Sequence, residues 1–281
     1  MAHPQIAAFA RLASGDQQPQ RSIYGQASKL SRSVHDIRYV EKYDEFVVAN
    51  SLAGAIMTFR GGADGQEAPI RVIQGSSSPG SANRLDVDPI HDEIFVPDNK
   101  RIRVYSRLAN GNVAPIRVIE GPDTQLVDAN SIAVDPINNI IAIGLNSDYG
   151  NEGPPSEEPE EKGAILVFNR TDSGNVKPRA VIRGDKSGII RINQMQVYPP
   201  RKLIIATNPG IHDHMEPEGS FLGVWSYDDN GDVPPRWKIP TGRITTLKKV
   251  FGVALNPKNK EVIIADMRLN GIVTFSVPEI F

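Results

Sequence analysis

The chain has 281 residues and a net charge of −2, with 31 basic and 33 acidic side chains in near balance. Nucleic acid and anionic membranes attract strongly basic surfaces, which this composition does not supply. No apolar run approaches the roughly 18 residues that a membrane-spanning helix needs. The chain has no cysteine, which excludes disulfides, thiol catalysis and cysteine-bound metals. We therefore expect a protein or small-molecule partner, no nucleic acid and no membrane span.

Two strand-like stretches come first, residues 6–11 with Phe9 and residues 18–24 with Pro19. A unit of roughly fifty residues then repeats along the chain, which is the length of a propeller repeat. Its aromatic residue recurs as Phe9, Phe59, Tyr105, Phe168, Trp225 and Phe275, at intervals of 50, 46, 63, 57 and 50 residues by difference. Each full unit contains four short strands separated by turns. This pattern predicts an all-β protein, a β-propeller with four-stranded antiparallel blades.

The order of strands inside a blade follows from their composition. The first strand of each unit is the most apolar and is predicted to be innermost: residues 37–39, 85–87, 132–134, 195–197 and 253–255. The second strand follows at residues 46–48, 94–96, 141–143, 204–206 and 262–264. The strand that contains proline is predicted to be outermost, because proline cannot donate to a strand ladder.

Counting the strands favours five blades. Innermost and second strands occur five times each, and the last unit ends at its aromatic strand, residues 272–276, without a proline strand of its own. Residues 18–24 can supply that strand, so we expect the N-terminal segment to close the ring. The prediction is one propeller domain over residues 1–281, and six blades remain the alternative.

The repeat resembles those of NHL-type propellers. It is most similar to bacterial exported proteins that repeat Arg-x-x-x-Gly-Asn-x-x-Pro-x-Arg-x-Ile-x-Gly, a motif matched by residues 107–121 and approximately by residues 11–25. The resemblance covers the whole chain and implies a secreted protein, periplasmic or extracellular, whose leader has been removed. It implies no activity, because propellers host many unrelated functions.

Function in a propeller is expected at the mouth of the central channel, where equivalent residues of successive blades converge. Equivalent polar positions lie before the innermost strands and after the second strands. The predicted ligand-binding residues are His35, Asp36, Asn50, Asn83, Arg84, Asp98, Asn130, Asn193, Asn208 and Asp266. Asparagine and aspartate at strand ends also form turns by bonding to their own backbone, which is the alternative explanation.

The same positions include candidate metal ligands. Amide and carboxylate oxygens suit a hard cation such as Ca²⁺. Two long insertions, at residues 148–162 and 211–218, follow second strands on adjacent blades, and the latter adds a histidine pair with the spacing of metal ligands. The candidate metal ligands are Asn83, Asn130, Asn193, Asn208, His212 and His214.

Two functions are compatible with this pattern. We favour a non-enzymatic propeller that binds a protein or small ligand at the channel mouth, with a structural cation. The alternative is a Ca²⁺-dependent lactonase or esterase-type hydrolase resembling gluconolactonase propellers, in which the metal polarises a carbonyl and activates water. Its candidate carboxylates are Asp36, Asp98 and Asp266. The sequence contains no other catalytic motif, such as Gly-x-Ser-x-Gly.

Overall fold

The computed structural model describes residues 4–32, 34–78, 82–146, 163–210 and 219–281. These residues form antiparallel strands and six three-residue 3₁₀ helices, and none of them lies in an α-helix or in a helix able to span a membrane. The 3₁₀ helices are η1 (Gln26–Ser28), η2 (Glu41–Tyr43), η3 (Ser51–Ala53), η4 (Pro122–Thr124), η5 (Pro199–Arg201) and η6 (Pro257–Asn259).

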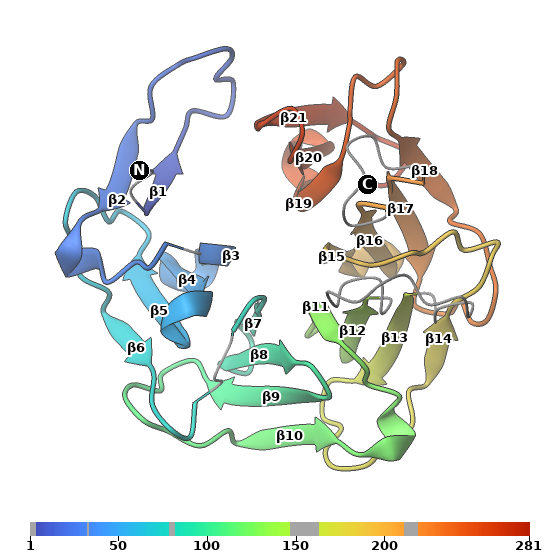
Figure 1. Cartoon of the computed structure of the whole chain (residues 1–281), viewed down its shortest axis with the longest axis horizontal. Coiled ribbons are helices and arrows are strands. Elements are labelled where there is room, and N and C mark those ends of the chain that lie inside the picture. Colours follow the sequence, from blue (N-terminus) through green and yellow to red (C-terminus); the bar gives the residue numbers. More distant parts are fainter. Residues whose placement is uncertain (1–3, 33, 79–81, 147–162, 211–218) are drawn as a thin grey trace, which may run out of the picture. The chain divides into compact units, whose positions relative to one another are not determined.

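The strands form sheets that follow the repeat (Figure 1). The fold class is a five-bladed β-propeller. Four sheets have four strands each. They are β3 (Val34–Val40), β4 (Glu45–Asn50), β5 (Ala55–Arg60) and β6 (Arg71–Ile73); β7 (Asp86–Asp88), β8 (Glu93–Asp98), β9 (Arg101–Ser106) and β10 (Arg117–Glu120); β11 (Ala129–Asp135), β12 (Ile140–Leu145), β13 (Ala164–Asn169) and β14 (Ala180–Ile182); and β15 (Gln194–Tyr198), β16 (Leu203–Asn208), β17 (Phe221–Ser226) and β18 (Trp237–Pro240). In each, neighbours in sequence are neighbours in the sheet, so the predicted strand order is confirmed.

The two ends of the chain differ from the prediction of the closing blade. The last sheet has three strands, β19 (Val250–Asn256), β20 (Glu261–Asp266) and β21 (Gly271–Ser276). The N-terminal strand that we expected to complete it, β2 (Arg21–Tyr24), pairs in this structure with β1 (Gln5–Ala8). Twelve residues, 9–20, separate β1 from β2, so this pairing closes a far shorter loop than a pairing of β2 with the C-terminal strand would.

The chain divides into two compact units, residues 1–98 with 103–117 and residues 99–102 with 118–281. Each unit has its own apolar clusters. In the first unit, one cluster includes Val47, Ile56, Leu85 and Ile94. In the second, one cluster includes the fully buried Trp225 with residues of β12, β13 and β16.

The repeat motif forms backbone and side-chain hydrogen bonds between consecutive blades. The outer-strand residue Ile73 pairs with Gly111, and Gly75 has a left-handed φ of 144°. A Cβ on Gly75 would lie 2.5 Å from the side chain of Asn112, whose Oδ1 accepts a hydrogen bond from the Ser77 N–H at 2.9 Å. The same pairing recurs between Ile119 and Gly174. Glycine is therefore required where the outer strand passes the neighbouring turn.

Candidate functional site

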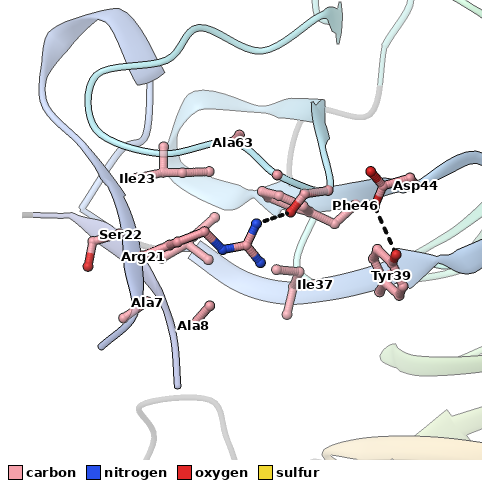
Figure 2. Close-up of a pocket in the computed structure, with 13 residues that line it drawn as sticks. Ala7, Ala8, Arg21, Ser22, Ile23, Ile37, Tyr39, Asp44, Phe46 and Ala63 are labelled. Atoms are coloured by element: carbon pink, nitrogen blue, oxygen red, sulfur yellow. Dashed lines mark hydrogen bonds between the residues drawn. The ribbon is translucent and has the colours of Figure 1, made fainter. Parts of the chain in front are cut away.

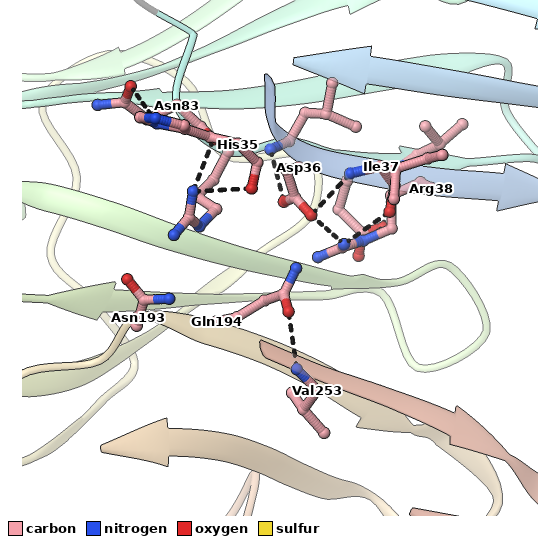
Figure 3. A network of polar contacts seen from close by, with 12 residues as sticks. His35, Asp36, Ile37, Arg38, Asn83, Asn193, Gln194 and Val253 are labelled. Carbon is pink, nitrogen blue, oxygen red and sulfur yellow. Dashed lines mark hydrogen bonds and ion pairs between the residues drawn. The ribbon is translucent and has the colours of Figure 1, made fainter. Parts of the chain in front are cut away.

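In the first unit, the predicted residues around β3 and β7 form one polar network (Figure 3). A β-bulge in β3 leaves His35 without a partner residue in the β4 register, and its ring is exposed. Its Nδ1 lies 3.1 Å from Oδ1 of Asn83, which also accepts a hydrogen bond from Ser51 Oγ at 2.5 Å. Bulges re-aim side chains and are common beside functional sites. The structure thus brings the side chains of His35 and Asn83 together.

Two arginines lie under this pair, in different electrostatic surroundings. Arg38 bonds Asp36 through Nη1 at 2.6 Å and Asp86 through Nε at 3.1 Å. Burial lowers the pKa of Arg38, but the two carboxylates outweigh it and the net shift is upward. Arg84 is 7% exposed, and its Nη1 donates at 3.0 Å to the backbone carbonyls of His35 and Asn83. Burial lowers the pKa of Arg84, because it outweighs the attraction of Asp36.

Sequence reasoning missed Arg38 and Asp86 as members of this network. They occupy the same position in successive innermost strands, next to Ile37 and Leu85 respectively. An available signal was the opposite charge at equivalent positions of adjacent repeats. Their ion pair shows that the innermost strands β3 and β7 are joined by charge as well as by apolar packing.

Three of the ligand-binding residues predicted after the second strands are buried and bond backbone groups of the chain. Asn50 and Asn208 are fully buried, and Asp266 is 2% exposed. Oδ1 of Asn208 accepts hydrogen bonds from the N–H groups of Ile190 and Arg191 at 3.0 and 3.1 Å. Asn50 holds Ser31 in the same way, at 3.0 Å. These three side chains tie their second strands to the segments that enter the innermost strands.

The remaining predicted residues also have defined partners. In the second unit, the Nδ2 groups of Asn130 and Asn193 donate to the carbonyls of Ile192 and Phe251 at 3.3 and 2.7 Å. Bulges occur at Asn130 and Phe251 as at His35. Asp98 pairs with Arg103 at 2.9 Å. Each carboxylate proposed for a hydrolase therefore has a protein partner, Asp36 with Arg38, Asp98 with Arg103 and Asp266 with backbone N–H groups.

The metal site stays a prediction. His212 and His214 lie outside the described residues. Among the residues that are described, no group of three or more histidine, aspartate or glutamate side chains could hold a metal ion. Amide oxygens of Asn83 and Asn208 already accept hydrogen bonds from protein donors.

The prediction of Ca²⁺ binding has a direct test. If the predicted asparagine ligands bind Ca²⁺, protein purified without chelator will contain calcium by elemental analysis, and added Ca²⁺ will raise the melting temperature. Asn130→Ala should abolish both effects, because it removes one oxygen ligand. Calcium-free protein that shows no thermal shift would contradict the prediction.

Comparison with known proteins supports the fold and leaves the family open. No protein-family model and no curated protein matches the chain, so the NHL-like type stays a prediction. Among solved structures, a chain of a mitotic checkpoint complex is similar over 79% of this chain and 58% of its own, with 16% identity and a TM-score of 0.51. A chain of Kuenenia stuttgartiensis hydrazine synthase is similar over 86% of this chain and 59% of its own, with 10% identity and a TM-score of 0.56. This chain spans less than two thirds of both. At these identities, the likeness shows the β-propeller fold alone.

Proposed function

We propose that this propeller is a non-enzymatic binding protein whose site, at the mouth end of β3 and β7, takes a small anionic ligand. The observation that carries the proposal is the buried guanidinium of Arg84. Burial disfavours its charge, and its Nη1 group donates to two neutral carbonyls. Asp36 attracts this guanidinium, and an anionic ligand would add to that attraction, since charge-assisted hydrogen bonds are about twice as strong as neutral ones.

The surroundings of Arg84 support an anion over a cation. Arg84 bonds the backbone of His35 and Asn83, whose imidazole and amide can donate or accept according to tautomer and rotation. Arg38 contributes a second cation, although Asp36 and Asp86 neutralise it. The bulge at His35 supplies backbone that is not committed to the strand ladder. We infer a ligand with one carboxylate or phosphate group.

Thermal-shift titration with phosphate, citrate and glutamate tests this proposal. We expect at least one of these anions to raise the melting temperature, and Arg84→Met to weaken its binding roughly 10- to 100-fold, which corresponds to one charge-assisted hydrogen bond. Arg84→Lys keeps the charge and should retain part of the affinity.

The matched control is Arg101→Gln, an exposed arginine 3.8 Å from Glu120. It should leave the anion affinity unchanged. Absence of any anion-dependent shift, or equal affinity in the wild type and both Arg84 variants, would refute the proposed site.

A further inference from the structure

Two loops meet at the end of the last blade where β19 begins and β20 ends (Figure 1). Residues 242–249 lead into β19, and residues 267–270 join β20 to β21. The buried carboxylate of Asp266 accepts hydrogen bonds from both loops, from the N–H of Lys248 at 2.7 Å and from that of Arg268 at 2.9 Å. The N–H of Met267 also donates to the carbonyl of Lys249 at 3.0 Å. The two loops are therefore fixed side by side.

These loops are basic, although the whole chain carries a net charge of −2. Residues 242–249 and 267–270 contain four cationic side chains and no acidic one. Lys249 is 4% exposed, whereas Arg243, Lys248 and Arg268 are exposed. Three exposed cations are thus gathered at one end of the blade, which the overall composition does not reveal.

Large apolar side chains are exposed on the same two loops. Ile244 is 97% exposed, Met267 is 60% exposed and Leu269 is 41% exposed. A side chain in a groove is partly covered by the walls, so an exposure of 97% places Ile244 on a protruding tip. The pocket in the first unit is different, because its apolar side chains, which include Ile37 and Phe46, line a hollow of about 460 Å³ (Figure 2).

The structure of the loop holds Ile244 in this position. Leu247 is fully buried in the apolar cluster of the last two blades. The N–H of Gly242 donates to the carbonyl of Leu247 at 2.8 Å, and the hydroxyl of Thr245 donates to the carbonyl of Pro240 at 2.6 Å. Because the loop is already ordered, little conformational entropy is lost when Ile244 enters another environment.

The fold does not require an apolar residue at this position. The equivalent loop of each unit begins at a glycine with a left-handed φ: Gly25, Gly75, Gly121, Gly184 and Gly242. Two residues after these glycines stand Ala27, Ser77, Asp123, Lys186 and Ile244. All five side chains are exposed, and only the last is a large apolar one. Exposure is therefore a property of the position, and the isoleucine is particular to the last blade.

Cations beside a protruding apolar side chain match the interface of a lipid bilayer. Lysine and arginine attract anionic headgroups, while an apolar tip enters the boundary between headgroups and acyl chains. A small ligand needs a concave site that buries most of its surface, which a protruding tip does not offer. An acidic protein segment would neutralise the cations, but it would gain from Ile244 only if it brought an apolar pocket of its own.

We propose that these two loops form a docking patch for an anionic lipid bilayer, made of Arg243, Ile244, Lys248, Met267, Arg268 and Leu269. The three cations contact the headgroups, and Ile244 inserts below them. Neither contribution is a stable anchor alone, so the contact is peripheral and reversible. It uses none of the residues of the anion site proposed around Arg84.

Sedimentation with phosphatidylcholine vesicles, prepared with and without phosphatidylserine, tests the proposal. We expect the protein to sediment only with the vesicles that contain phosphatidylserine, and less as salt is added, because salt screens the charges. Lys248→Gln with Arg268→Gln should weaken the partitioning about 25-fold, since each cation near the surface contributes about fivefold. Ile244→Ser should weaken it about tenfold or more, because an isoleucine side chain is no longer buried.

Matched controls are available in the same unit. Lys258→Gln with Lys260→Gln removes two exposed lysines at the opposite end of the last blade. Ile137→Ser removes an isoleucine that is 72% exposed in the turn between β11 and β12. Both variants should bind phosphatidylserine vesicles as the wild type does. All substituted side chains are exposed, so the melting temperatures should stay close to that of the wild type.

A fluorescent label reports insertion directly, because the chain has no native cysteine. An environment-sensitive fluorophore on Ile244→Cys should shift its emission to the blue when phosphatidylserine vesicles are added, and the same label on Ile137→Cys should not. The proposal is overturned if the wild type does not sediment with these vesicles, or if Ile244→Ser binds them as tightly as the wild type. Binding of soluble polyglutamate without binding of vesicles would also overturn it, and would indicate an acidic protein partner.

Discussion

Asp266→Ala is expected to lower the free energy of unfolding by about 4 kcal/mol. Asp266 is 2% exposed, and its carboxylate accepts four backbone hydrogen bonds. One oxygen bonds the N–H groups of Lys248 and Lys249 at 2.7 and 3.0 Å, and the other bonds those of Arg268 and Leu269 at 2.9 and 3.0 Å. Alanine leaves these donors unpaired in a buried site, where each lost bond to a charged group costs about 1.5–3 kcal/mol and the costs are not additive. Urea denaturation measures the loss.

Two substitutions that keep the side-chain volume, Asp266→Asn and Asn208→Asp, test whether the hydrogen bonds of these residues account for the expected loss of stability. Asn208, at the equivalent position, meets two N–H donors and also two carbonyl acceptors, Gly188 and Gly219. Asp266→Asn therefore turns an amide donor toward N–H groups, and Asn208→Asp turns an oxygen toward carbonyls. Both should be destabilising by about 2 kcal/mol or more. The exposed Asp16→Ala should change stability by less than about 0.5 kcal/mol. Stable Asp266→Asn and Asn208→Asp variants would contradict this account.

The arrangement of strands could be predicted from the sequence because the same pattern of apolar, aromatic and proline positions recurs in successive units. Phe59, Phe168 and Trp225 are fully buried at equivalent positions, and the strands that follow the repeat prolines lie at sheet edges. The pairing of β2 with β1 could not be predicted in this way. It depends on which of two similar strands occupies one edge, and Ile6 and Ile272 stand at the same repeat position.

The candidate site could be predicted only in part. Position along the strand identified His35 and Asn83, because the bulge and the turn place them at one end of the blades. The same rule also selected Asn50 and Asn208, whose side chains bond backbone groups of the chain. A sequence does not show which way an amide points. That direction depends on the donors and acceptors that the fold brings next to it.

Alkaline pH is expected to destabilise the protein through Tyr227. This tyrosine is 2% exposed, and its hydroxyl donates to Oδ2 of the buried Asp135 at 2.8 Å. Burial, with the hydrogen bond and the charge of Asp135, raises the pKa of Tyr227 far above its usual value near 10. Above pH 10 the unfolded chain loses this proton and the folded protein keeps it. The contribution of Tyr227 to stability is therefore complete below pH 10 and falls by about 1.4 kcal/mol per pH unit above it.

Tyr227→Phe isolates this effect from all other titrations. At pH 8 the variant should be less stable than the wild type by about 1.5 kcal/mol, because Asp135 loses one of its donors and keeps those of Ile137 and Asn138. The difference should shrink above pH 10 and vanish near pH 11, where the loss in the wild type reaches about the same size. Tyr24→Phe, at an exposed site, should follow the wild-type curve at every pH. If the stability curves of wild type and Tyr227→Phe run parallel from pH 8 to 11.5, the proton of Tyr227 is not held by the fold, and its bond to Asp135 contributes no more than an ordinary surface contact.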